Sequence, residues 1–210
     1  MAADRDLWQL IFAERAALAE DLGALTDEQW ATPSLCAGLS VREVLAHMTA
    51  GASDNPVVWF AGVLRNRFDF DVNVAQRLAQ RLGTDPADTL RRFHGVCTSR
   101  TKAPIPVVAM LGEAVVHGED IRRPLGLRRE YPMEALDRLA HFYAGSDLMV
   151  PSAARARGLR LRAVDGDVTV GSGPEVAGTT LALVMALTGR DDYLSELDGP
   201  GLAEFAARRG

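Results

Sequence analysis

The chain has 210 residues, of which 48% are hydrophobic and 24% are charged, with 23 Lys and Arg against 28 Asp and Glu. This composition is typical of a globular protein and excludes an intrinsically disordered one. The net charge of −5 gives no basic surface for DNA or RNA. The length suits one domain, or a main domain with a small second one.

Cys36 and Cys97 are too few for a disulfide framework, which is typical of a reducing compartment. The amino-terminal residues lack the basic start and the apolar core of a signal peptide. The longest apolar run, residues 181–187, is far shorter than the ~20 residues that cross a bilayer. We therefore expect a cytoplasmic protein that binds neither membranes nor nucleic acids.

The first 150 residues carry helical patterns. Glu14 interrupts the apolar stripe of the first helix, where an apolar residue would be expected. Ser40 and Glu43 have capping-box spacing and predict a helix that begins at Val41. The predicted helices cover about residues 4–22, 41 to a break at 54–56, 57–68, 86–100, 107–122 and 132–149, with a short turn at 26–30.

After Pro151 the pattern changes to alternation, which is typical of strands. Residues 159–163 and 168–170 flank a hairpin turn at Asp165-Gly166, and residues 175–177 suit a third strand. Two helices, at about 179–187 and 200–208, complete the chain. The predicted fold is mainly α: a four-helix bundle over residues 1–150, then a small α/β domain over 151–210 with a short antiparallel sheet.

The candidate chemistry lies in the predicted helix 107–122. Glu113 and His117 are four residues apart, so their side chains share one helix face, and Asp120 continues that stripe. Their neighbours are mostly apolar, and a buried carboxylate and imidazole are costly unless they are paired or bind a metal. Helical bundles build metal sites from such inward-facing Glu and His residues.

A third ligand has to come from another helix. His47 is flanked by apolar residues on the helix that begins at Val41. With Glu113 and His117 it would supply two nitrogens and one oxygen, the ligand set of a zinc site with one open position.

Simpler interpretations exist for these residues. A Glu–His pair at this spacing is often only hydrogen-bonded, and a lone inward histidine is often a satisfied core residue. Cys36 is most simply a small buried hydrophobe, although it could also be a nucleophile or a fourth ligand. His94 suits the surface or its boundary, and His141 suits either the core or the surface.

Two segments resemble motifs of the mycothiol-dependent maleylpyruvate isomerase family, a branch of the DinB-like metal-binding bundles. They are Pro33–His47 (PSLCAGLSVREVLAH) and Gly112–Gly126 (GEAVVHGEDIRRPLG). Residues 171–190 are similar to the family's small carboxy-terminal domain, so the resemblance covers about residues 8–206. Leu39 stands where the family usually has Trp, and Glu119 where it often has Gln.

The resemblance implies a divalent metal, usually Zn²⁺, held by His47, Glu113 and His117. It also implies mycothiol as cosubstrate and an arginine from the carboxy-terminal domain, for which Arg190 is the candidate.

Our leading hypothesis is a metalloenzyme in which a metal-bound low-molecular-weight thiol attacks a small electrophile, as an isomerase or as a thiol S-transferase. Asp120 would orient His117, while Arg42, Arg122 and Arg190 are candidates for binding a substrate carboxylate. The alternatives are a hydrolase that uses metal-bound water and a non-catalytic module that binds a metal or small molecule. Both a monomer and a homodimer remain open.

Overall fold

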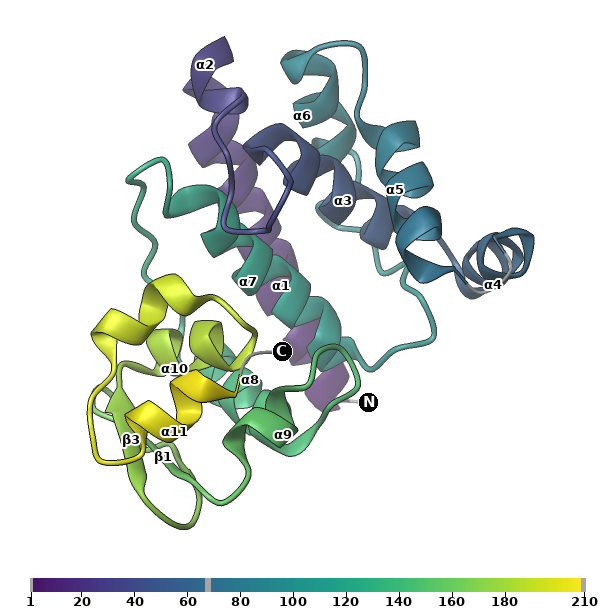
Figure 1. The fold of residues 1–210 in the computed structure, drawn as a ribbon. Coiled ribbons are helices and arrows are strands. Elements are labelled where there is room, and N and C mark those ends of the chain that lie inside the picture. The colour runs from purple at the N-terminus through teal and green to yellow at the C-terminus, as the bar shows by residue number, and fades with distance from the viewer. Residues whose placement is uncertain (1, 67–68, 209–210) are drawn as a thin grey trace. The chain divides into compact units, whose positions relative to one another are not determined.

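The computed structural model describes residues 2–66 and 69–208 (Figure 1). The chain divides into two compact units, with the division between Arg129 and Glu130. The predicted mainly helical fold with a small sheet near the carboxyl end is confirmed. None of the helices within the described residues has the length and apolarity needed to cross a bilayer.

The first unit is helical. In it, α1 and α3 each contact both α6 and α7, so these four helices surround a common interior, and α5 packs on α3. Figure 1 shows α1 and α7 side by side. The elements are α1 (Ala2–Asp21), the 3-10 turn η1 (Leu22–Ala24), α2 (Asp27–Trp30), α3 (Val41–Ser53), α4 (Pro56–Arg65), α5 (Phe70–Arg81), α6 (Pro86–His94) and α7 (Val107–Arg122).

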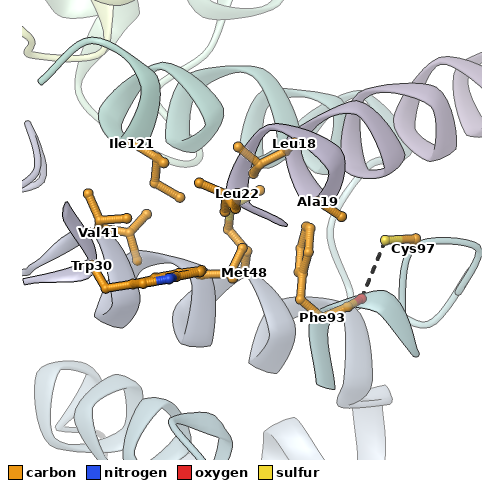
Figure 2. Packing of buried hydrophobic residues seen from close by; sticks show 11 residues of the cluster. Leu18, Ala19, Leu22, Trp30, Val41, Met48, Phe93, Cys97 and Ile121 are labelled. Carbon is orange, nitrogen blue, oxygen red and sulfur yellow. Dashed lines mark hydrogen bonds between the residues drawn. The ribbon is translucent and has the colours of Figure 1, made fainter. Parts of the chain in front are cut away.

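The interior of this unit is apolar. Side chains from α1, α2, α3, α6 and α7 converge in one cluster (Figure 2). The Cys97 thiol donates a weak hydrogen bond to the Phe93 carbonyl at 3.4 Å, so Cys97 is a structural residue of this core. The labelled members are Leu18, Ala19, Leu22, Trp30, Val41, Met48, Phe93, Cys97 and Ile121.

Glu14, which interrupts the apolar stripe of α1, has a defined partner. Its side chain is completely buried, and both of its carboxylate oxygens accept hydrogen bonds from Arg129, each at 3.0 Å. A buried carboxylate is tolerated when a guanidinium pairs with it in this bidentate way. The interruption is therefore an ion pair inside the core.

The helix α5 is absent from our predicted elements. Asp69 caps it by accepting the Val72 amide hydrogen, but α5 is held to α3 mainly by polar contacts. Arg77 and Arg81 both pair with the buried Asp54, and Arg77 also donates to the Ala50 carbonyl. The side chains that anchor α5 to α3 include Arg77 and Arg81, whose partner Asp54 lies more than 20 residues earlier, so the local sequence does not indicate these contacts. The end of the predicted helix 57–68 lies outside the described residues.

The second unit combines a three-stranded sheet with helices. Its strands are β1 (Arg160–Ala163), β2 (Thr169–Gly171) and β3 (Glu175–Gly178), in the order β2-β1-β3. Its helical elements are α8 (Met133–Gly145), α9 (Ser152–Ala156), α10 (Thr180–Leu187), the 3-10 turn η2 (Asp191–Glu196) and α11 (Leu202–Ala207).

The sheet is mixed, whereas we predicted an antiparallel one. β1 pairs antiparallel with β2 and parallel with β3. The chain passes from one edge of β1 to the other through the turn between β2 and β3. There Gly173 has a φ of +125°, and a Cβ on it would overlap the Gly158 carbonyl oxygen. The local sequence indicates the strands and the turn, but which edge of β1 receives β3 depends on this close backbone approach.

The observed division also precedes the predicted boundary at residue 150. Helix α8 contacts α9, α10 and β2, so it belongs to the second unit. Its apolar stripe resembles that of a bundle helix, and a stripe does not identify the surface that covers it.

Candidate metal centre

The helix α3 places His47. The Ser40 side chain accepts the Glu43 amide hydrogen, and the Glu43 carboxylate accepts the Ser40 amide hydrogen at 2.8 Å, which completes the predicted capping box. The Ser40 hydroxyl also donates to the Glu43 carboxylate at 2.6 Å, and this bond first and the Ser40 amide bond second lower the pKa of Glu43. With the start fixed at Val41, His47 lies almost two turns into the helix.

The helix α7 places Glu113 and His117. Most of its residues are buried, because it packs against both α1 and α3. The two ligand candidates lie where α7 faces α3, and their side chains remain 23% and 13% exposed, against 25% for His47. The centre is therefore mostly enclosed but still accessible from solvent.

The structure brings the three predicted ligands together. The Nε2 atom of His47 lies 3.4 Å from Glu113 Oε2, and His117 Nε2 lies 3.6 Å from the same oxygen. The two imidazole rings meet edge to face, with centroids 4.9 Å apart. One ligand atom from each residue lies within 4.8 Å of the others.

These separations fit a small tetrahedral ion. Two ligand atoms that each lie about 2.0–2.1 Å from such an ion are roughly 3.3 Å apart. Two imidazole nitrogens and one carboxylate oxygen form a donor set that suits zinc. Among the described residues, no fourth His, Cys, Asp or Glu joins this group. The geometry thus fits a three-ligand site.

Asp120 contacts the other ring nitrogen of His117. Its carboxylate is completely buried, and one of its oxygens lies 2.8 Å from His117 Nδ1. Because an ionised carboxylate can only accept, a hydrogen on Nδ1 is donated to Asp120 and the lone pair remains on Nε2. That tautomer directs the Nε2 lone pair of His117 toward Glu113 and His47.

Arg15, which interacts electrostatically with Glu113, is absent from the predicted site residues. Arg15 is 3% exposed, and its Nη1 donates to the Ser99 carbonyl at 3.0 Å. Burial lowers its pKa to about 10, while the charges of Cys97 and Glu113 act in the opposite direction. Arg15 therefore stays positively charged at neutral pH and lies close enough to Glu113 to interact with it electrostatically. Arg15 follows Glu14 on α1, so in the sequence it is only a second charged residue that interrupts the apolar stripe of that helix.

Cys36 forms a second possible ligand group with His117 and Asp120, again with one atom from each within 4.8 Å. The two groups share His117. In the second group, His117 and Asp120 already contact each other through the Nδ1 atom of His117. The first group uses the Nε2 atom of His117, which that contact leaves available, so we favour the first group as the metal centre. Cys36 itself is half-buried and packs against the core cluster, consistent with its simplest interpretation.

The arginine candidates do not gather at this centre. Arg42 donates to the 82–83 carbonyls and the Thr89 hydroxyl, so its guanidinium holds the start of α6 against α3, and its substrate role stays a prediction. Arg122 is completely buried and bonds to Asp21. Arg190 lies in the second unit, where it donates to the Thr188 carbonyl, and its substrate role stays a prediction. His94 and His141 are both exposed.

The chain is similar to known proteins in sequence and in fold. The sequence model described as "Mycothiol maleylpyruvate isomerase N-terminal domain" matches residues 11–122, which include all three ligand candidates. No curated protein sequence is significantly similar to the chain. The crystal structure of the mycothiol-dependent maleylpyruvate isomerase aligns with a TM-score of 0.66 at 13% identity, covering 94% of this chain and 92% of that one. A histidine-to-alanine mutant of that enzyme aligns with a TM-score of 0.65 at 12% identity, over the same shares.

Proposed function

Since the chain belongs to the mycothiol maleylpyruvate isomerase N-terminal domain family, we propose that it is a zinc-dependent enzyme that uses mycothiol. Its substrate would be a small electrophile that is isomerised or receives the thiol. The observation that carries this proposal is the convergence of His47, Glu113 and His117, with both Nε2 atoms within 3.6 Å of one carboxylate oxygen.

The three side chains would hold the ion. A bound zinc ion supplies an open coordination position at which a thiol is ionised near neutral pH. Asp120 keeps the Nδ1 proton of His117, so the ring stays a neutral ligand. Arg15 adds a fixed positive charge that interacts with Glu113.

The observed arrangement favours this proposal over a purely structural metal site. Structural zinc sites have four protein ligands, whereas catalytic sites have three and an open position. Three ligand candidates of these types meet here within the described residues, and all three keep some solvent exposure. An exogenous ligand can therefore reach the centre.

The direct test is metal analysis of protein purified without a metal-affinity tag. We expect about one zinc per chain, lost in His47→Ala and in Glu113→Ala. His94→Ala is the matched control, because His94 is exposed and lies outside the centre; it should retain the metal.

The activity test adds mycothiol to the zinc-loaded protein with maleylpyruvate and with simple aromatic and haloalkyl electrophiles. We expect isomerisation or conjugation that depends on both metal and thiol. Zinc-loaded protein that is inert toward every electrophile, or that hydrolyses esters or amides without thiol, would contradict the proposal.

A further inference from the structure

Gly51 lies one helical turn after His47 on α3, on the face directed toward α7. The two facing helices thus present four positions at the centre: 47 and 51 on α3, and 113 and 117 on α7. Three of these positions carry ligand candidates and the fourth has no side chain. A Cβ built on Gly51 would lie 3.9 Å from Glu113 Oε2, the oxygen that both histidines approach.

Neither the backbone nor the packing requires glycine at this position. Gly51 has ordinary helical geometry, and it is not among the glycines with positive φ. The nearest atom outside the local helix is at the ordinary van der Waals distance of 3.9 Å, so alanine would fit. Glycine weakens a helix interior relative to alanine. The missing side chain therefore brings no benefit to the fold.

The backbone around Gly51 is nevertheless held in place. The Ala50 carbonyl accepts a hydrogen bond from Arg77 Nη2 at 3.1 Å, and the Ala52 carbonyl accepts one from the Ser99 hydroxyl at 2.8 Å. These contacts fix the helix on both sides of the glycine. The space next to the Gly51 Cα therefore belongs to an ordered part of the helix and does not result from local fraying.

We propose that Gly51 keeps the fourth coordination position free for the sulfur of an exogenous thiol, and so determines how large a ligand the centre accepts. This inference rests on the proposed function. A side chain at position 51 would project toward the space beside Glu113 Oε2, between α3 and α7. Gly51 is itself half-buried, so that space can be reached from solvent.

The test uses Co²⁺ in place of zinc, because thiolate binding to Co²⁺ produces a charge-transfer absorption that can be titrated without any turnover. Mycothiol is added to the Co²⁺-loaded wild type, Gly51→Ala and Gly51→Leu. We expect all three to bind about one Co²⁺, with the apparent Kd for the thiol raised at least about tenfold in Gly51→Leu. Gly51→Ala, which fits sterically and improves the helix, should show a smaller increase.

Two further variants make the result specific. Gly23→Leu is the matched control, because Gly23 lies in open space on η1, and it should bind thiol like the wild type. Gly51→Asp places a second carboxylate at the centre as a fourth ligand candidate, and it should retain Co²⁺ while losing the thiol absorption. Circular dichroism together with Co²⁺ stoichiometry identifies any variant that fails to fold.

The outcomes separate the two proposals. A Gly51→Leu protein that binds Co²⁺ and takes up the thiol with unchanged affinity would overturn the role of Gly51 while leaving the metal centre intact. A correctly folded wild type that binds no Co²⁺ would overturn the proposed function, and the role of Gly51 with it.

Discussion

At the scale of single residues, His117 uses both ring nitrogens. Its Nε2 faces Glu113 at 3.6 Å, and its Nδ1 contacts the buried Asp120 at 2.8 Å. Such outer contacts fix the tautomer and the ring orientation of a metal ligand, so they influence affinity without touching the ion. The buried carboxylate in turn depends on the imidazole as its polar partner.

Asp120→Asn should weaken zinc binding by about 10–100-fold while leaving about one site per chain, because the neutral amide holds the Nδ1 proton less firmly. Competition with a chromophoric chelator gives the affinity, and nitrogen chemical shifts report the His117 tautomer. Asp6→Asn, at an exposed position on α1, is the control. An unchanged affinity in Asp120→Asn would mean that this contact does not act on the metal centre.

The Glu14–Arg129 pair allows a second prediction at this scale. Arg129→Met should reduce the free energy of unfolding by about 3 kcal/mol, because it leaves the fully buried Glu14 carboxylate without this guanidinium. The double variant Glu14→Leu with Arg129→Met should recover most of that loss, since an apolar pair carries no desolvation penalty. Urea denaturation measures both values. A double variant as unstable as the single one would show that the pair contributes by more than charge compensation.

At the scale of helices and strands, the bounds of an element can be predicted well when residues at its two ends start and stop it. The helices α3 and α7 begin and end close to their predicted bounds because a capping box starts α3, while Pro106 precedes α7 and Pro124 follows it. The helix α5 was missed because the contacts that hold it lie on another helix, at Asp54 and Ala50. The contacts of Arg42 could not be predicted for the same reason, because its partners at residues 82–83 are distant in sequence.

The capping box makes a prediction that depends on pH. Ser40→Ala should reduce the free energy of unfolding by about 1 kcal/mol at neutral pH. The hydrogen bonds from Ser40 lower the pKa of Glu43 below its ordinary 4.5, so this stabilisation is fully present above that value and is lost as the pH falls through the lowered pKa. The difference between wild type and variant should therefore shrink on acidification.

Denaturation from neutral pH down to about pH 3 measures that difference. Glu43→Gln is the control, because it keeps the side-chain length and removes the titrating group. A gap between wild type and Ser40→Ala that stays constant over the whole range would contradict the proposed coupling.

At the scale of the whole molecule, the candidate centre joins two helices that are far apart in sequence but contact each other within the first unit. An ion that binds only the folded form stabilises it by about 2.7 kcal/mol at a hundred times its Kd. That stabilisation should be largest where the ligands lie, on α3 and α7.

Zinc should accordingly slow amide hydrogen exchange in α3 and α7 and leave exchange in β1, β2 and β3 nearly unchanged. Hydrogen exchange followed by mass spectrometry on protein with and without zinc measures this. His47→Ala should lose the protection, whereas His94→Ala should keep it. Equal protection in both units, or protection that persists in His47→Ala, would contradict binding at this centre.

The sequence by itself determined the features that depend on a few neighbouring residues. These are the start of α3, the shared face of Glu113 and His117, the contact of His117 with Asp120, and the turn at Asp165-Gly166. Helical and strand periodicity, caps and turn residues act over one or two turns of chain, so they are visible without a structure.

Only the tertiary structure decided which distant residues meet. It brought His47 to Glu113, paired β3 parallel to β1, assigned α8 to the second unit and left Gly51 facing the centre. These outcomes depend on which buried faces cover one another and on how closely backbones approach. A sequence shows that a face is apolar, but the partner that buries it is fixed by packing over the whole unit.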